Sequence, residues 1–385
     1  MQDRKRWYRS FTENSYVTIQ RTHGQVHTMR RTPETDGDEP NETAAEPQSL
    51  TSDSGVSRRR TLQSIGVLSA LGLTGTASMT NVTSSSQEEN DENGDSVENS
   101  ELDEDIFSSV TTKVDGVDLH YVTGGSGPPV VLVHGWPQTW YEWQNVMPEL
   151  AEDYTVVAPD LRGAGGSEVT PAGYDKRTMA EDIRGIVEKL DGERIDFVGH
   201  DIGGMVGYAY ANEYPDTLRS YTILDVPLPG IEPIWSMVLQ SSESWHFGFH
   251  ATPELPETLV GENLELYLSD FFARMANDPL AITGESLDAY VDAYSDPENL
   301  RAGFEYYRAF PADIRRNNRY SNTELQMPVL ALGGAASAGP FMTQMMNQVA
   351  ADVRGGSINR SGHWITEEQP DALAARLLDF FGNGN

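Results

Sequence analysis

Cysteine is absent from this chain of 385 residues. Its absence excludes disulfides, thiolate nucleophiles, cysteine metal ligands and a lipid-modified cysteine. The eight histidines are scattered without the spacing of a metal site, so the sequence implies no bound metal. Lysine is scarce, because the 27 basic residues include only four lysines, which are Lys5, Lys113, Lys176 and Lys189.

The charge of the chain is strongly one-sided. Its 59 Asp and Glu residues give a formal net charge of -32. A surface of this sign repels nucleic acid and anionic membranes, so we expect no nucleic-acid partner. An acidic excess with arginine preferred over lysine is typical of proteins from salt-loving organisms, where high salt screens the self-repulsion. An ordinary acidic protein with one disordered tail is the alternative interpretation.

Residues 1–105 contain few apolar runs and many Ser, Thr, Glu, Asp and Asn residues. Such a segment cannot bury enough apolar surface to offset the conformational entropy of the chain, so we exclude it from the predicted fold. Its last part, residues 84–105, is predicted to be a disordered acidic linker. Asn81-Val82-Thr83 has the spacing of a glycosylation acceptor, a triplet that is common by chance.

An export signal is predicted within residues 1–83. Arg58-Arg59, followed by Leu62 and the weakly apolar stretch Ser64–Ser78, resembles a twin-arginine signal. The apolar stretch is too short and too rich in glycine for a transmembrane helix, so we expect no membrane insertion. We therefore expect export to the extracellular or cell-surface side, and a cytoplasmic location if the signal is not used. The long segment before the arginines leaves Met29 open as the true start.

From Ile106 onward, apolar segments alternate with turn signals to the end of the chain. This pattern predicts helices such as Thr178–Leu190 and Pro370–Phe381 between strands, which is typical of an α/β sheet with a parallel core. The predicted strands are Val110–Val114, Asp118–Thr123, Val130–His134, Thr155–Pro159, Ile195–Gly199, Tyr221–Asp225, Val329–Leu332 and Gly356–Asn359.

The segment Gly199-His200-Asp201-Ile202-Gly203-Gly204 follows one of these strands. Glycines on both sides of Asp201 suit a sharp strand-to-helix turn, in which the backbone is strained and the next helix packs closely. A carboxylate at the centre of such a turn attacks carbon by displacement and forms an alkyl ester. The residues thus indicate a nucleophile for electrophilic alkyl carbons, and the alternative is an Asp that only caps the following helix.

Three further motifs occur in a characteristic order. They are His134-Gly135-Trp136-Pro137, Asp160-Leu161-Arg162-Gly163-Ala164-Gly165-Gly166-Ser167 and Ser361-Gly362-His363-Trp364. With the Asp201 segment they resemble the α/β-hydrolase fold, in its branch of epoxide hydrolases and haloalkane or haloacetate dehalogenases. The resemblance covers the chain from Ile106 onward. It implies an eight-stranded, mostly parallel sheet formed by residues 106–230 and 320–385, with a helical cap domain, residues 231–319, inserted after the sixth strand.

The resemblance assigns roles to the motif residues. The N–H groups of Trp136 and Ile202 would form the oxyanion hole, and His363 would be the general base. His134 and His200 are more simply interpreted as buried, hydrogen-bonded structural residues.

The acid that orients the base departs from the commonest family pattern. The loop Leu332–Gly339, where many relatives carry it, holds no carboxylate. Asp225 follows the sixth strand, where some members of this branch place the acid, and is therefore predicted to orient His363. A cap for the next segment is the alternative role for Asp225.

The predicted cap is rich in Trp, Tyr and Phe. Aromatic clusters of this kind are more often packing than catalysis. Together with Asp201, however, His246 and Tyr307 resemble the ring-opening pair of an epoxide hydrolase subgroup that uses His plus Tyr. By that resemblance they would donate hydrogen bonds to the epoxide oxygen.

The predicted reaction is the opening of an epoxide to a vicinal diol through a hydroxyalkyl ester on Asp201, without a cofactor. We expect an apolar small-molecule substrate, either an epoxide or a halogenated compound, and leave a homodimer open. A haloalkane or haloacetate dehalogenase is the nearest alternative. Haloacetate enzymes usually carry Arg where this chain has Ile202, and a His-Trp pair where it has Trp245-His246. A non-catalytic secreted binding protein on the same fold is the alternative of another class.

Overall fold

The computed structural model describes residues 102, 106–190 and 194–382. The predicted export signal at Arg58-Arg59 lies outside the described residues, as does almost all of the predicted acidic linker. No helix in the part of the chain that is described has the length and apolar character needed to cross a membrane.

Eight strands form one sheet with the order β1-β2-β4-β3-β5-β6-β7-β8. The pairs β1–β2 and β2–β4 are antiparallel, and the pairs that join β4 through β8 are parallel. The fold prediction, an eight-stranded and mostly parallel sheet, is confirmed. The strands are β1 (Phe107–Val114), β2 (Val117–Gly125), β3 (Pro129–Val133), β4 (Thr155–Pro159), β5 (Ile195–His200), β6 (Leu218–Leu224), β7 (Val329–Gly334) and β8 (Val353–Ile358).

Several predicted strand ends were wrong. β1, β6 and β8 each begin three residues before their predicted starts. The first residues of β6 and β8 include Ser220 and Arg354, which carry no apolar signal but pair through their backbones with the neighbouring strand. At the other end, His134, Asp225 and Asn359 lie one residue past their strands. His134 and Asp225 therefore lie in the loops that follow the carboxyl ends of β3 and β6.

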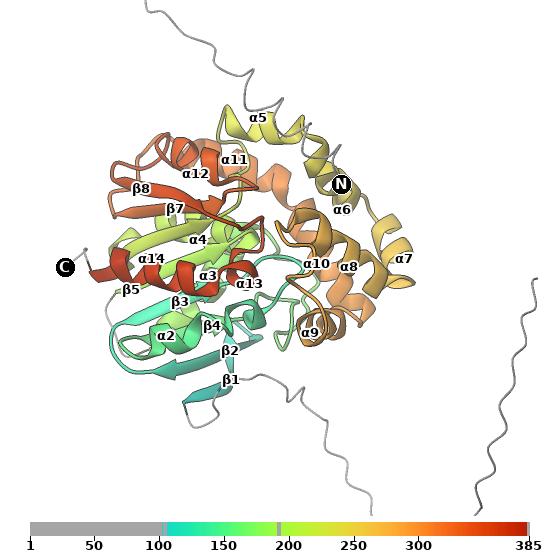
Figure 1. Cartoon of the computed structure of the whole chain (residues 1–385), viewed down its shortest axis with the longest axis horizontal. Helices are drawn as coiled ribbons and strands as arrows, with labels where there is room; N and C mark the ends of the chain where they lie inside the picture. Colours follow the sequence, from blue (N-terminus) through green and yellow to red (C-terminus); the bar gives the residue numbers. More distant parts are fainter. Residues whose placement is uncertain (1–101, 103–105, 191–193, 383–385) are drawn as a thin grey trace, which may run out of the picture. The chain divides into compact units, whose positions relative to one another are not determined.

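Helices cover both faces of the sheet (Figure 1). The alternation of side chains along β3 shows the two layers, since Val131 and Val133 pack in one core and Val130 and Leu132 in the other. The first core includes residues of α3 (Lys176–Val187), α4 (Ile202–Glu213) and α12 (Gly339–Met346). The second includes residues of α2 (Met147–Ala151) and α14 (Pro370–Gly382). Helix α3 begins two residues before its predicted start because Asp175 caps it, accepting from the N–H of Thr178 at 3.3 Å.

A helical insertion follows β6, as predicted, and occupies one side of the molecule in Figure 1. Its boundaries at residues 231 and 319 stay a prediction. The helices between β6 and β7 are α5 (Ile234–Leu239), α6 (Trp245–Ala251), α7 (Leu255–Gly261), α8 (Leu264–Met275), α9 (Glu285–Ala293), α10 (Pro297–Arg308) and α11 (Phe310–Tyr320).

The insertion is joined to the sheet domain by a buried ion pair. Lys176 at the start of α3 lies 3.2 Å from Asp313 of α11, and both side chains are almost fully buried. The Lys176 ammonium also donates to the backbone oxygen of Tyr306 at 2.5 Å. Because both charged groups are paired and hydrogen-bonded, this contact fixes α10 and α11 against the core.

Candidate active site

Asp201 lies in the tight turn between β5 and α4. Its backbone has φ 47° and ψ -121°, a region that non-glycine residues rarely adopt. Gly203 permits the turn, because a Cβ there would lie 2.0 Å from the backbone oxygen of Val133. Within the described chain the Asp201 side chain makes no capping hydrogen bond to α4. Asp201 therefore does not make the hydrogen bond that its alternative role as a helix cap requires.

The backbone N–H of Trp136 donates to Oδ1 of Asp201 at 3.1 Å. Ile202 is the first residue of α4 and is fully buried. Amides in the first turn of a helix have no partner within the helix, so the Ile202 N–H is placed to donate beside Asp201. The two residues predicted to form the oxyanion hole thus flank the carboxylate.

His363 faces Asp201 from the loop after β8. Its Nε2 lies 3.8 Å from Oδ2 of Asp201, and its Nδ1 lies 2.8 Å from Oδ2 of Asp225. Because an ionised carboxylate only accepts hydrogen bonds, Nδ1 of His363 is the donor to Asp225, and Nε2 is the ring nitrogen that faces Asp201. The structure brings together Asp201, Asp225 and His363, whose side chains are all largely buried.

Asp225 sits immediately after β6 with φ 48°. Besides His363, its carboxylate accepts from the N–H of Gly334 at 2.8 Å, the hydroxyl of Ser337 at 2.6 Å and the N–H of Ala338 at 3.1 Å. These three donors belong to the end of β7 and the loop that follows it. That loop carries no acid of its own and instead holds the acid that follows β6.

His246 of α6 and Tyr307 of α10 lie against one another in the insertion. Their ring centroids are 6.0 Å apart and the planes are nearly perpendicular. Both side chains are buried, and Nδ1 of His246 has no hydrogen-bond partner among the described residues. The surrounding rings are those of Trp136, Phe247, Phe271 and Phe310.

Burial keeps both of these groups neutral. It lowers the pKa of His246 to about 4, an effect that the nearby Asp201 charge only partly offsets. Burial, and then the Asp201 charge, raises the pKa of Tyr307 well above its usual value. At neutral pH each side chain therefore holds a proton that it can donate in a hydrogen bond, close enough to Asp201 for that charge to act on it.

A second buried histidine of α6 escaped the sequence analysis. His250 lies one helical turn after His246, with its ring 4.6 Å from that of Tyr307 and 4.5 Å from that of Trp136. Its Nε2 lies 2.5 Å from the hydroxyl of Tyr267. The spacing of four residues between the two histidines was the only signal in the sequence, and it does not distinguish packing from chemistry.

His200 and Glu142 form a buried pair behind the base. The predicted structural role of His200 fits its contacts, because Nδ1 lies 3.0 Å from Oε2 of Glu142 and Nε2 lies 3.0 Å from the backbone oxygen of His363. Burial alone would lower the pKa of His200, but the charge and hydrogen bond of Glu142 outweigh it and raise the pKa to about 9. His134 is equally buried and accepts from the N–H of Leu161.

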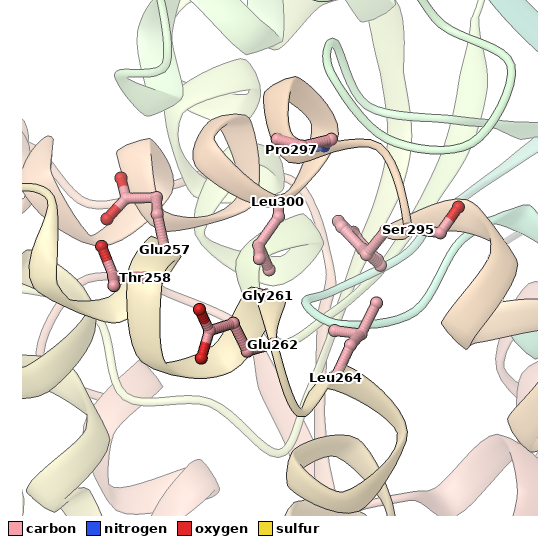
Figure 2. Close-up of a pocket in the computed structure, with 9 residues that line it drawn as sticks. Glu257, Thr258, Gly261, Glu262, Leu264, Ser295, Pro297 and Leu300 are labelled. Atoms are coloured by element: carbon pink, nitrogen blue, oxygen red, sulfur yellow. The ribbon is translucent and has the colours of Figure 1, made fainter.

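No group of three or more His, Asp or Glu side chains in the described part of the chain is arranged to hold a metal ion. A cavity of about 260 Å³ lies elsewhere, among α7, the end of α9 and α10 (Figure 2). Its lining includes Glu257, Glu262 and Leu300 but none of the predicted site residues. This cavity is therefore distinct from the Asp201 site.

The described geometry can be compared with known proteins. The family model described as the alpha/beta hydrolase fold matches residues 128–370. The chain is 36% identical over 280 residues to the soluble epoxide hydrolase of Corynebacterium sp. (strain C12), a match that covers 70% of this chain and 95% of that protein. It is 32% identical over 284 residues to the fluoroacetate dehalogenase of Burkholderia sp, covering 70% and 92%. A solved structure of the epoxide hydrolase CorEH superimposes with a TM-score of 0.67 at 35% identity, covering 72% of this chain and 100% of that one.

Proposed function

The chain belongs to the α/β-hydrolase fold family, and from this membership and the site geometry we propose that it hydrolyses epoxides to vicinal diols. The observation that carries the proposal is the pair of neutral, buried donors, His246 and Tyr307, held beside a turn that presents a carboxylate. An opening epoxide places negative charge on oxygen, which two preorganised donors in a dry site stabilise. The likeness to an epoxide hydrolase over almost the whole of that relative supports the same reaction.

The first step is displacement at carbon. A lone pair of the Asp201 carboxylate forms a bond to an epoxide carbon, and the electrons of the breaking carbon–oxygen bond pass to the epoxide oxygen. That oxygen accepts hydrogen bonds from His246 and Tyr307 and takes up one proton from one of these two donors. The product of this step is a hydroxyalkyl ester of Asp201.

The second step is hydrolysis of this ester. Nε2 of His363 removes a proton from water, whose oxygen attacks the carbonyl carbon of the ester while Asp225 stabilises the imidazolium. The N–H groups of Trp136 and Ile202 stabilise the oxyanion. The bond between that carbon and the diol oxygen then breaks, and the proton returns from His363 to the leaving oxygen. Asp201 is left as a carboxylic acid, and its proton returns to the donor that gave one up in the first step. Epoxide and water are thus consumed, one diol leaves, and the Asp201 carboxylate is regenerated.

A dehalogenase on the same nucleophile is the second candidate, and the likeness to a fluoroacetate dehalogenase favours it. In that reaction Asp201 would displace halide and His246 and Tyr307 would stabilise the departing anion. An acid substrate also requires a cation for its carboxylate. Ile202, next to the nucleophile, is apolar and fully buried, which favours an uncharged substrate.

The test is to trap the ester. The His363→Gln variant is incubated with a panel of epoxides and, separately, with fluoroacetate and chloroacetate, and the peptide that carries Asp201 is weighed by mass spectrometry. The expected result is an adduct with the mass of the epoxide. An acid-derived adduct formed with loss of halide would replace the proposal by dehalogenation. No adduct in this variant, together with an inactive wild type, would favour the binding-protein interpretation. Asp201→Asn is the matched control and should form no adduct.

We propose export through the twin-arginine pathway, carried by Arg58-Arg59, and activity at high salt, for which the net charge of -32 argues. Replacement of Arg58-Arg59 by two lysines should retain the protein inside the cell. Sedimentation at several salt concentrations would decide whether it forms the homodimer that the sequence leaves open.

A further inference from the structure

The loop that carries His363 is seated on the C-terminal turn of α8. The backbone N–H of His363 donates to the backbone oxygen of Met275 at 2.9 Å. The indole N–H of Trp364 donates to the backbone oxygen of Phe272, also at 2.9 Å, and the two rings pack with centroids 4.8 Å apart. The last carbonyl of the helix, that of Met275, has no partner within the helix, so the N–H of His363 satisfies it. The carbonyl of Phe272 already accepts from the N–H of Ala276 and gains the indole of Trp364 as a second donor.

Glu368 forms hydrogen bonds to both the His363 loop and the residues that follow α8. One carboxylate oxygen accepts from the N–H of Gly362 at 2.7 Å. The other accepts from the N–H groups of Asn277 and Asp278 at 2.8 and 3.0 Å. Glu368 thereby connects the residue before His363 to the residues that follow α8, through three backbone donors.

The His363 loop and the end of α8 pack so closely that there is no room for a side chain at Gly362. A Cβ at Gly362 would lie 2.3 Å from the backbone oxygen of Met275 and 2.5 Å from the nitrogen of Asn277. The residue next to Phe272 reaches the other half of the site, because the ring of Phe271 packs on that of His246 with centroids 5.1 Å apart. Helix α8 therefore touches both the oxygen donors of the insertion and the loop of the base.

We propose that Glu368 is a positioning residue for the second half of the reaction: by clamping the end of α8 to the His363 loop, it fixes Nε2 of the base against the ester of Asp201. The inference rests on the proposed function. Glu368 touches neither the reacting atoms nor the groups that form the ester, because Asp201 is held by its own turn and by the N–H of Trp136. Its loss should therefore act on ester hydrolysis and leave ester formation intact.

Single-turnover kinetics of Glu368→Ala and Glu368→Gln separate the two steps. Styrene oxide, cyclohexene oxide and 1,2-epoxyhexane serve as probes, and the alkylated fraction of Asp201 is followed by intact mass after rapid quenching. We expect ester formation at the wild-type rate and ester hydrolysis slower by about 10- to 100-fold in Glu368→Ala, because a misplaced base loses its line of attack. The ester should therefore accumulate. Glu368→Gln retains one acceptor oxygen and should lie between Glu368→Ala and the wild type.

Glu265→Gln is the charge-matched control, since this glutamate is exposed in the first turn of α8. It should behave as the wild type. Ester hydrolysis at the same rate in Glu368→Ala and the wild type would overturn the positioning role. An equal fall in the rates of ester formation and ester hydrolysis would also overturn it, because a general loss of structure slows both steps.

A second measurement does not depend on any substrate. The proton between Nδ1 of His363 and Asp225 is observed by proton NMR at low field, with Asp225→Asn used to assign it. In Glu368→Ala this resonance should shift or broaden, whereas an unchanged resonance would overturn the inference. If His363→Gln forms no adduct with any epoxide, it is the proposed function that fails, and the NMR result still decides whether Glu368 positions the histidine.

Discussion

Oδ2 of Asp225 lies 2.8 Å from Nδ1 of His363 although the two residues are 138 positions apart and Asp225 follows β6. β6 and β7 are parallel neighbours in the sheet, so the loops after both strands open at the same edge. The loop after β7 supplies Gly334, Ser337 and Ala338 as donors to the carboxylate. An acid that follows either strand can therefore reach the same histidine. Here the loop after β7 stabilises Asp225, which follows β6.

Replacement of Asp225 by Asn should stop the reaction at the ester. The amide can donate to Nδ1 of His363, which would move the ring proton to Nε2 and remove the base. By comparison with the same change in a serine-protease triad, we expect ester hydrolysis to fall by about 10⁴-fold while Asp201 is still alkylated. Rapid quenching and intact mass would show the enzyme accumulating as the ester. Free, unmodified Asp225→Asn enzyme after incubation with a wild-type substrate would contradict this role.

Ser337→Ala should have a much smaller effect than Asp225→Asn. Its hydroxyl is one of four donors to the carboxylate, and the loss of one hydrogen bond to a charged group costs about 1.5–3 kcal/mol. Because the pair Asp225 and His363 stays in place, ester hydrolysis should slow by roughly 10- to 150-fold at most, far less than in Asp225→Asn. The comparison uses the same single-turnover assay. A loss in Ser337→Ala as large as that in Asp225→Asn would mean that the hydroxyl holds the carboxylate in place by itself.

Much of the fold could be predicted because the informative residues are local. The glycines around Asp201 fix a turn, and the apolar runs before it and after it are a strand and a helix. Parallel strands place the residues after their carboxyl ends at one edge. The resemblance to the α/β-hydrolase fold assigned Asp225 to His363, and this shared edge explains why Asp201 and Asp225 both lie beside that histidine.

The parts that could not be predicted depend on partners far away in the sequence. His200 contacts Glu142 at a separation of 58 residues and His363 at a separation of 163. Glu368 binds the amides of Asn277 and Asp278, which are 91 and 90 residues away. These are contacts to a single carboxylate or to backbone atoms, and neither leaves a periodic or spaced signal in the sequence. The first residues of β6 and β8 escaped for a related reason, because backbone pairing rather than apolar character defines them.

His246→Phe and Tyr307→Phe should impair the first step and leave the second untouched. Each change removes one donor to the epoxide oxygen from a buried site, and the loss of one such donor costs about 10²- to 10³-fold in rate. Because the ester now forms more slowly than it is hydrolysed, no adduct should accumulate in either variant. This is the reverse of the expectation for Asp225→Asn. Accumulation of the ester in Tyr307→Phe would assign that residue to hydrolysis instead.

The His200–Glu142 pair should make the folded state lose stability at alkaline pH. The pKa of His200 is about 9 in the folded chain, above the value of about 6.5 for an unfolded histidine. Its contribution is therefore fully present below pH 6.5 and is lost as the pH rises through 9, and it amounts to about 3 kcal/mol. Urea unfolding of wild type and His200→Gln at pH 6.5 and 9.5 measures it. The difference in unfolding free energy between the two proteins should shrink at the higher pH.

His246 should make the folded state lose stability at acidic pH. Its folded pKa is about 4, below the unfolded value of about 6.5, so between these values the unfolded chain binds a proton that the folded chain does not. Burial of the neutral ring therefore destabilises the folded state progressively as the pH falls from 6.5 to 4, by about 3 kcal/mol in all. His246→Phe removes the titrating group and keeps an aromatic ring among Phe247 and Phe271. Its unfolding free energy should fall less than that of the wild type over this range. Parallel curves for the two proteins would contradict the lowered pKa of His246, because the buried imidazole would then gain its proton in the folded state as easily as in the unfolded one.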